Sequence, residues 1–265
     1  MKLGIIQLSA ARDTPERIVA LMEAAISEST AQDVDLVVFP ELTLPGYNVP
    51  ERHQRDAQST DGLWMTRIAG MAREYRCAIA LGWAERADDT VYNSATVVAR
   101  TGDVVAHYRK RQLFGAMEHE SFAHGTAPAP IFEIAGRKCG LLICYEIEFP
   151  EYARDLARRG AEVVIVPTAN PKGYEHVQDV LIPARACENR QFVAYANYCG
   201  EQAGLEFSGL SLVAGPDGKP LARAGCEPTA LYVQLPELAD YPAQSLSTQL
   251  ADLRQLAARS DVPHL

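Results

Sequence analysis

The chain has 265 residues, which fits one large domain or two small ones at about 150 residues per domain. Its 25 Lys and Arg residues against 34 Asp and Glu residues give a net charge of −9, which disfavours electrostatic binding to nucleic acid or to an anionic membrane surface. Hydrophobic residues make up 48% of the chain, enough to build a core without disulfides or a structural metal.

The cysteines and the apolar runs indicate the cellular compartment of the protein. The six cysteines have no CxxC pair and no regular spacing, which favours a reducing compartment. The apolar run at residues 3–6 is too short for the core of a signal peptide, and no segment approaches the ~18 consecutive apolar residues of a membrane span. A P-loop and a GxGxxG fingerprint are both absent. We therefore expect a soluble, cytoplasmic protein without a cofactor.

The first part of the chain predicts a strand-helix-strand unit. An apolar strand at residues 3–8 precedes Asp13-Thr14-Pro15, a candidate helix cap followed by proline at the first helical position. Residues 15–30 place apolar side chains at the spacing of 3 and 4 that marks one helix face. Residues 36–39 form a continuous apolar strand that ends at Pro40-Glu41. Such a unit requires a parallel sheet.

The same order returns in the second half, with a strand at 139–144, a helix at 151–159 closed by Gly160 and a strand at 163–166. Between the halves we expect strands at 78–83, 93–100 and 104–108, the last two joined by a hairpin turn, which makes the sheet partly antiparallel. Beyond residue 170 the pattern predicts a helix over 174–190 interrupted near Pro183, then strands at 192–197, 209–214 and 230–235. No linker divides the chain, so we expect one α/β domain over residues 1–265, with 237–265 as a C-terminal tail.

Three reactive side chains follow expected strands, at the ends where chemistry gathers in open α/β sheets. Glu41 follows Phe39-Pro40, Lys110 follows residues 107–109, and Cys144 ends an apolar run. Each has an ordinary interpretation when taken alone: a capping carboxylate, one charge of a solvated turn, and a small buried hydrophobe. The combination of carboxylate, ammonium and thiol is what suggests nucleophilic catalysis.

These residues also carry a resemblance. The segments Phe39-Pro40-Glu41-Leu42, Tyr108-Arg109-Lys110 and 144–151 (CYEIEFPE) are similar, in order and separation, to the three motif blocks of the carbon-nitrogen hydrolase (nitrilase) superfamily. Weaker similarities extend from Met1 to about Leu235, including Tyr92-Asn93-Ser94 and residues 166–170. The resemblance implies a four-layer αββα sandwich with mixed sheets and a Glu-Lys-Cys triad made by Glu41, Lys110 and Cys144. It also implies a second glutamate, for which Glu118 fits better than Glu120.

Cleavage of an amide needs a nucleophile, a proton for the departing nitrogen and positive charge for the oxyanion. In the implied triad, Cys144 is the nucleophile and Glu41 is the base that takes the thiol proton. Lys110 stabilises the oxyanion together with the backbone N–H of Tyr145, and Glu118 orients Lys110 and the substrate nitrogen.

The residues in and around the motif blocks restrict the expected class of substrate. The resemblance is greatest to the branch of small aliphatic amidases that includes 5-aminopentanamidase and stereoselective amidases. Tyr145 stands where true nitrilases usually carry Trp. We therefore expect hydrolysis of a small aliphatic primary amide, with an N-carbamoyl amine hydrolase as the close alternative. The expected substrate-binding residues are Tyr47, Trp83, Tyr145 and Asn170, and the carboxylates that would favour a cationic ω-amino amide are Glu118, Glu146 and Glu148.

Other classes of function stay open at this point. A small-metabolite-binding α/β protein would keep Cys144 as an inert buried residue. A zinc site built from His119, His124, Glu118 and Glu120 would instead make the protein a metal-dependent hydrolase. The resemblance also implies a homodimer or a higher homo-oligomer, and in the tail Leu250, Leu253 and Leu256 form a short apolar stripe that would cover the same domain or a partner subunit.

Overall fold

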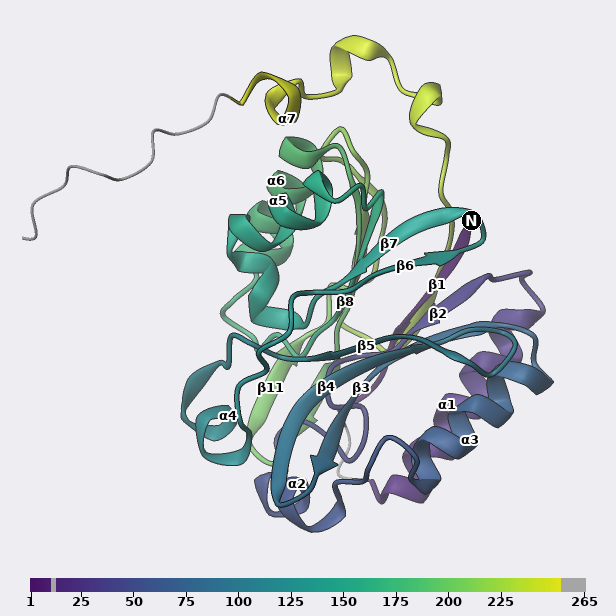
Figure 1. Cartoon of the computed structure of the whole chain (residues 1–265), viewed down its shortest axis with the longest axis vertical. Helices are drawn as coiled ribbons and strands as arrows, with labels where there is room; N and C mark the ends of the chain where they lie inside the picture. Colours follow the sequence, from purple (N-terminus) through teal and green to yellow (C-terminus); the bar gives the residue numbers. More distant parts are fainter. Residues whose placement is uncertain (11–12, 254–265) are drawn as a thin grey trace, which may run out of the picture.

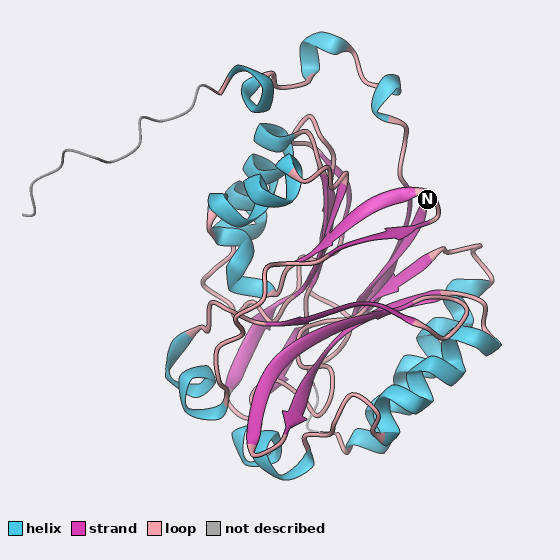
Figure 2. Cartoon of the chain, in the orientation of Figure 1, coloured by secondary structure: helices cyan, strands magenta, loops and turns pink. Residues whose placement is uncertain are grey.

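The computed structural model describes residues 1–10 and 13–253 (Figure 1). Two six-stranded mixed sheets pack face to face, and helices cover the outer face of each (Figure 2). The arrangement has four layers, helix, sheet, sheet and helix, which confirms the αββα sandwich expected from the resemblance.

The first sheet has the strand order β14-β1-β2-β3-β4-β5. Strands β1, β2 and β3 run parallel, whereas β14, β4 and β5 are antiparallel to their neighbours. Helices α1 and α3 cover its outer face (Figure 1). The strands are β1 (Lys2–Gln7), β2 (Leu36–Val38), β3 (Ala78–Ala87), β4 (Thr90–Val98), β5 (Val104–Arg109) and β14 (Thr229–Gln234), and the helices are α1 (Pro15–Thr30) and α3 (Leu63–Glu74).

The second sheet has the order β13-β12-β9-β8-β7-β6 and repeats this plan. Its parallel strands are β7, β8 and β9, and helices α5 and α6 lie on its outer face (Figure 1). The likeness of the two halves is therefore confirmed. The elements are β6 (Ile131–Ile134), β7 (Arg137–Leu141), β8 (Val163–Pro167), β9 (Phe192–Ala196), β12 (Leu212–Ala214), β13 (Pro220–Arg223), α5 (Pro150–Arg158) and α6 (Ile182–Asn189).

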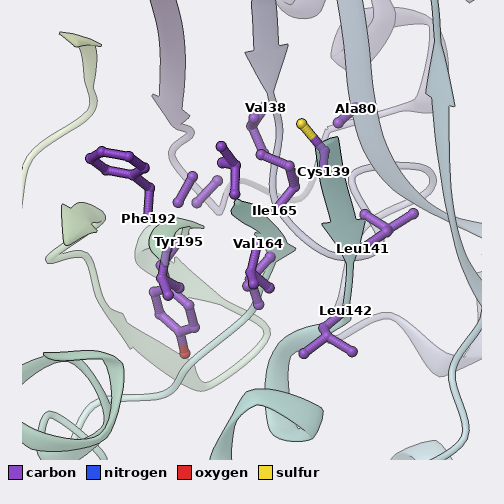
Figure 3. Close-up of a cluster of buried hydrophobic side chains, with 14 of the residues drawn as sticks. Val38, Ala80, Cys139, Leu141, Leu142, Val164, Ile165, Phe192 and Tyr195 are labelled. Carbon is purple, nitrogen blue, oxygen red and sulfur yellow. The ribbon is translucent and has the colours of Figure 1, made fainter. Parts of the chain in front are cut away.

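Apolar side chains of the two sheets meet in one core (Figure 3). Val38 and Ala80 of the first sheet pack with Cys139, Leu141 and Ile165 of the second, and all five have no exposed surface. Strands buried on both faces are apolar along their whole length, which is why these strands appear in the sequence as continuous apolar runs. Full burial of one such large aliphatic side chain contributes about 1.5–3 kcal/mol to folding.

Shorter elements complete the described part of the chain. β10 and β11 form a separate two-stranded hairpin, and α2 and α4 lie at the end of the sheets where the loops gather. These elements are α2 (Pro50–Asp56), α4 (Gly115–Ser121), the 3-10 helix η1 (Cys144–Glu148), the π-helical turn η2 (Val177–Leu181), β10 (Cys199–Gln202), β11 (Leu205–Ser208), η3 (Leu238–Asp240), η4 (Ala243–Ser245) and α7 (Gln249–Asp252).

Several expected elements differ from those observed. The strand expected at 78–83 extends to Ala87, and the one expected at 93–100 lies at Thr90–Val98. The strand expected at 139–144 ends at Leu141, three residues before the cysteine. The strand expected at 209–214 is confined to β12, because Gly209 and Leu210 have φ angles of 67° and 56°, which a strand does not accommodate. The helix expected over 174–190 is divided into η2 and α6, with Pro183 in the first turn of α6, where its missing N–H costs nothing.

The last described residues, up to Leu253, pack only lightly on the rest. Helix α7 contacts α6, and Leu253 directly after it is 46% exposed. Leu256, the last member of the expected apolar stripe, lies outside the described residues. Association into a homodimer or higher oligomer stays a prediction, for which sedimentation is the test. Among the described residues, no helix combines the length and the apolar character that crossing a membrane requires.

Candidate active site

Glu41, Lys110 and Cys144 lie just beyond the carboxyl ends of β2, β5 and β7. The first two belong to one sheet and the third to the other, so the site forms where the two sheets meet. The loop after β2 is tied to the second sheet by the backbone N–H of Glu41, which donates to the carbonyl of Thr168, 3.2 Å away, directly after β8. A nearly continuous apolar framework therefore positions three polar side chains at one place.

The Lys110 ammonium lies between two carboxylates. Its Nζ donates to Glu41 Oε1 over 2.5 Å and to Glu118 Oε1 over 2.8 Å, and none of the three side chains is exposed. Burial alone would lower the pKa of Lys110, but the charges of Glu118 and Glu41 outweigh it and raise the pKa. Lys110 is therefore a permanent cation in the site and not a base.

The two oxygens of the Glu41 carboxylate differ in their partners. Oε1 accepts hydrogen bonds from Lys110 and from Asn93 Nδ2, which is 2.7 Å away. Oε2 is buried and has no hydrogen-bond partner among the described residues. Burial raises the pKa of Glu41 to about 7, against the attraction of Lys110 and with the repulsion of Glu118. A carboxylate with a free oxygen and a pKa near neutrality is suited to taking up and returning a proton.

Glu118, on α4, has every oxygen engaged. Besides Lys110, its Oε1 accepts from the Tyr47 hydroxyl at 2.8 Å, and its Oε2 accepts from the Phe114 backbone N–H at 3.0 Å. Glu120 is exposed. The structure thus places Glu118, and not Glu120, against Lys110. Its two oxygens are thus fixed by Lys110, Tyr47 and the Phe114 backbone.

Cys144 stands on a sharp turn. Its φ angle is +47°, a left-handed conformation that is rare for residues other than glycine, and η1 begins at this residue. Strained backbone of this kind tends to mark functional sites. Cys144 is 6% exposed. Burial and the Glu41 charge raise the pKa of its thiol, whereas Lys110 and the Thr168 hydroxyl lower it, so the resting group is a thiol that needs a base.

Glu146 holds this turn against β5. Its Oε1 accepts from the Tyr108 hydroxyl at 2.7 Å and from the Arg111 N–H at 2.8 Å, and its Oε2 accepts from the Ile143 N–H at 2.9 Å. These donors flank Lys110 on one side and Cys144 on the other. Glu146 is fully buried and fully engaged, so it is a structural link within the site and is excluded as a receptor for a substrate ammonium.

Glu148, at the end of η1, is the remaining candidate for such a receptor. It is half-buried, and no described residue donates a hydrogen bond to its carboxylate. Burial raises the pKa of Glu148, and the nearby charges of His176, Lys110 and Arg185 oppose that rise. The carboxylate is therefore close enough to Lys110 to interact with it and is still free of a partner.

The expected substrate-binding residues have different surroundings. Tyr145 is half-buried, with its ring centroid 5.2 Å from that of Phe114 and 4.9 Å from that of Phe149. Tyr47 is buried against the site through Glu118. The amide nitrogen of Asn170 donates to the Tyr174 carbonyl at 3.0 Å and to Gln178 Oε1 at 2.9 Å, which fixes the loop after β8.

The expectation that Trp83 lines the substrate pocket is wrong. Gly82 of β3 faces Glu41, because a Cβ at Gly82 would lie 2.5 Å from the Glu41 Cα. Neighbouring side chains of a strand point to opposite faces, so Trp83 points away from the triad. It packs in the core beneath the outer helices, and its indole N–H donates to Thr96 at 2.9 Å.

Two residues that contact the triad were not among the expected site residues. In the sequence, Asn93 and Thr168 appear only as parts of two segments with weaker similarity to the family. Asparagine is uncommon in strands, so Asn93 amid the apolar positions of β4 was a signal that could have been used. The described residues hold no group of three His, Cys, Asp or Glu side chains placed to bind a metal ion, and Glu118 of the considered zinc set is turned to Lys110.

Comparison with known proteins identifies the family. Residues 2–242 match the carbon-nitrogen hydrolase family model. An (R)-stereoselective amidase from a Pseudomonas species is 35% identical over 237 residues, 89% of this chain and 85% of that protein. A hydrolase encoded in the pqqF 5′ region of Pseudomonas protegens is 42% identical over 226 residues, 84% of this chain and 79% of that protein.

A solved structure adds information on the chemistry of a relative. A mutant of the amidase from Nesterenkonia sp. AN1, with the acetamide moiety of fluoroacetamide covalently added at its active site cysteine, matches with a TM-score of 0.86 and 35% identity. The match covers 96% of this chain and 94% of that chain. The fold, the family model and these relatives together show that the chain belongs to the carbon-nitrogen hydrolase family and is a hydrolase acting on carbon–nitrogen bonds other than peptide bonds.

Proposed function

We propose that the protein is a cysteine-dependent amidase that hydrolyses a small aliphatic primary amide to a carboxylate and ammonia through a thioester on Cys144. The observation that carries the proposal is the buried set of Glu41, Lys110 and Cys144, in which the carboxylate keeps one oxygen free. Amidases among the similar proteins support the same chemistry.

Acylation begins with loss of the thiol proton. Glu41 takes the proton from Cys144 as the sulfur electron pair forms a bond to the amide carbon, and the carbonyl π electrons move onto oxygen. Lys110 and the backbone N–H of Tyr145 stabilise that oxyanion. When the tetrahedral intermediate collapses, the carbon–nitrogen bond breaks, its electron pair leaves with nitrogen, and Glu41 returns the proton so that ammonia departs.

Deacylation uses the same groups in a second cycle. Glu41 takes a proton from water as the water oxygen attacks the thioester carbon, and Lys110 again faces the developing oxyanion. The carbon–sulfur bond then breaks, and the Cys144 sulfur recovers the proton. The sum is amide plus water to carboxylic acid plus ammonia, with no electron acceptor or donor required.

The finer specificity is for an amide with a cationic amino group a few carbons from the carbonyl. Glu148 supports this choice, because it is half-buried and forms no salt bridge or hydrogen bond with another described side chain, although the charges of His176, Lys110 and Arg185 act on it. An ammonium placed beside it would satisfy the carboxylate. The Tyr145 ring, which contacts the rings of Phe114 and Phe149, would supply apolar surface for the intervening methylenes.

A substrate panel tests the proposal. Ammonia and carbon dioxide release are measured together for 5-aminopentanamide, pentanamide, N-carbamoylputrescine and pentanenitrile. The expected order places 5-aminopentanamide first, with ammonia alone released, and the Cys144→Ala variant inactive on all four. Faster turnover of the carbamoyl compound with release of carbon dioxide would assign the alternative, N-carbamoyl amine hydrolase. Turnover of none of the four would reject the proposed substrate class.

A further inference from the structure

Asn93 makes contact with two members of the triad at once. Its backbone carbonyl accepts from the Lys110 backbone N–H at 2.8 Å, and its side-chain Nδ2 donates to Glu41 Oε1 at 2.7 Å. It lies in β4, which pairs with both β3 and β5, with no exposed surface. One residue therefore fixes the backbone of the ammonium-bearing residue and the side-chain orientation of the carboxylate.

The side-chain amide of Asn93 is buried beside Glu41. The bond to Glu41 is its one side-chain hydrogen bond among the described residues, and its Oδ1 is buried without a partner. Burying an amide oxygen without a hydrogen-bond donor costs free energy, typically about 1–3 kcal/mol in proteins. An apolar residue at this position in β4 would avoid the unsatisfied Oδ1 but would lose the hydrogen bond to Glu41, so the asparagine serves that one contact.

We propose that Asn93 is a positioning residue that holds Oε1 of Glu41 and thereby leaves Oε2 as the oxygen that takes the proton of Cys144. This inference rests on the proposed function. With Lys110 and Asn93 both bound to Oε1, the carboxylate has little freedom to turn, and proton transfer depends on that orientation. Without Asn93, Lys110 alone would hold the carboxylate, and either oxygen could face the ammonium.

Loss of Asn93 should also change the ionisation of Glu41, because a hydrogen bond to the charged form favours that form. Several titratable groups pack around Glu41 and oppose or support its negative charge. Those facing Glu41 are Lys110, Glu118 and Cys144, together with the phenols of Tyr47, Tyr195 and Tyr198. None of them replaces the lost donor, so the carboxyl should hold its proton to a higher pH.

The test compares Asn93→Ala with Asn189→Ala. Asn189 is a matched control: it is 2% exposed, its Nδ2 donates to the Arg185 carbonyl at 2.9 Å, and its Oδ1 is also buried without a partner. It makes no contact with the triad. Asn93→Asp serves as an isosteric second variant in case the alanine variant does not fold. Thermal unfolding is measured for all of them.

The main readout is the rate of Cys144 alkylation by iodoacetamide as a function of pH, followed on the Cys144 peptide by mass spectrometry. This rate reports the thiol and its base without any substrate, so it decides the inference even if the proposed amides are not turned over. We expect the acid limb of the alkylation rate to move up by about one pH unit in Asn93→Ala, the size of one lost hydrogen bond to a charge. Asn189→Ala should keep the wild-type limb.

Amidase kinetics provide the second readout. In Asn93→Ala we expect kcat to fall about tenfold or more with KM changed less than about threefold, since proton transfer and not binding is affected. A folded Asn93→Ala or Asn93→Asp protein with the wild-type acid limb and wild-type kcat would overturn the inference. An equal loss in Asn189→Ala would also overturn it, because the effect would then follow from any buried asparagine.

Discussion

Lys110 and Glu41 form a fully buried ion pair in which the ammonium also contacts a second carboxylate, Glu118. Two carboxylates thus share one ammonium, and the excess negative charge keeps Lys110 protonated while it disfavours ionisation of the Cys144 thiol. The resting site therefore has its proton on sulfur and its base beside it. In the proposed mechanism, Glu41 therefore takes the thiol proton as the sulfur attacks.

Lys110→Ala should lower kcat by about a hundredfold or more, the usual effect of removing one oxyanion donor. The reason is that the variant keeps the thiol but loses the positive charge facing the oxyanion, and it also leaves Glu41 and Glu118 unneutralised. Steady-state kinetics on the best amide of the panel measure it. Loss of affinity alone, with maximal turnover preserved, would make Lys110 a substrate anchor.

The activity should rise with pH through about 7. Glu41 acts as a base only when ionised, and burial raises its pKa to about 7, above the ordinary range of a glutamate. A profile of kcat/KM between about pH 3.5 and 8.5 therefore has an acid limb with a midpoint near 7. A midpoint near 4.5 would mean that the base titrates as an exposed carboxyl and would contradict the role given to Glu41.

Glu148→Gln should lower kcat/KM for 5-aminopentanamide by about tenfold and leave that for pentanamide nearly unchanged, because only the first substrate carries an ammonium. Glu151→Gln, on an exposed residue three positions further along, is the control. Equal losses on both substrates would mean that Glu148 supports the shape of the site and does not recognise charge.

Another buried carboxylate, Glu85, links the strands on the opposite face of the sheet. Burial disfavours its ionised form, but the His107 ring, with Nε2 3.0 Å from Oε2, and hydrogen bonds from Arg109 and Ser94 outweigh this and lower its pKa to about 2. Ser94 and Arg109 directly adjoin Asn93 and Lys110, so this network holds the same two strands that position the triad.

Glu85 should contribute to stability above about pH 4.5 and lose that contribution as the pH falls toward 2. Its pKa is lower in the folded chain than the ordinary 4.5, so the unfolded chain binds the proton first. Urea unfolding of wild type and Glu85→Gln at pH 6, 4 and 3 measures it. The difference in unfolding free energy should shrink as the pH falls, and a difference independent of pH would contradict the ionised network.

The sequence predicted elements best where a single physical pattern decides them. Helix α1 begins and ends at the expected residues, because Thr14 caps it and Pro15 opens it. The parallel strands were equally clear, as continuous apolar runs. Helix α3 was missed, although Trp64, Ile68 and Met71 recur at a helical spacing and are all buried.

The proposed triad of Glu41, Lys110 and Cys144 was predicted because these residues follow strands and match family motifs. The turn at Cys144 was not predicted, because its left-handed backbone depends on contacts with residues far away in the chain. The main contacts are the hydrogen bonds that Glu146 accepts from Tyr108 and Arg111. Trp83 was assigned to the wrong face of β3 for a related reason. Which face of β3 lies against Glu41 is decided by packing between distant segments and not by the order of residues.

The central claim is a thioester on Cys144, and one measurement tests it most directly. The protein is quenched in acid during turnover of the best amide and digested, and the Cys144 peptide is weighed by mass spectrometry. We expect the mass of the acyl group on that peptide in wild type, and in Cys144→Ala neither the adduct nor more than about a thousandth of the activity. Undiminished turnover by Cys144→Ala, or an acyl group on a different residue, would contradict the account.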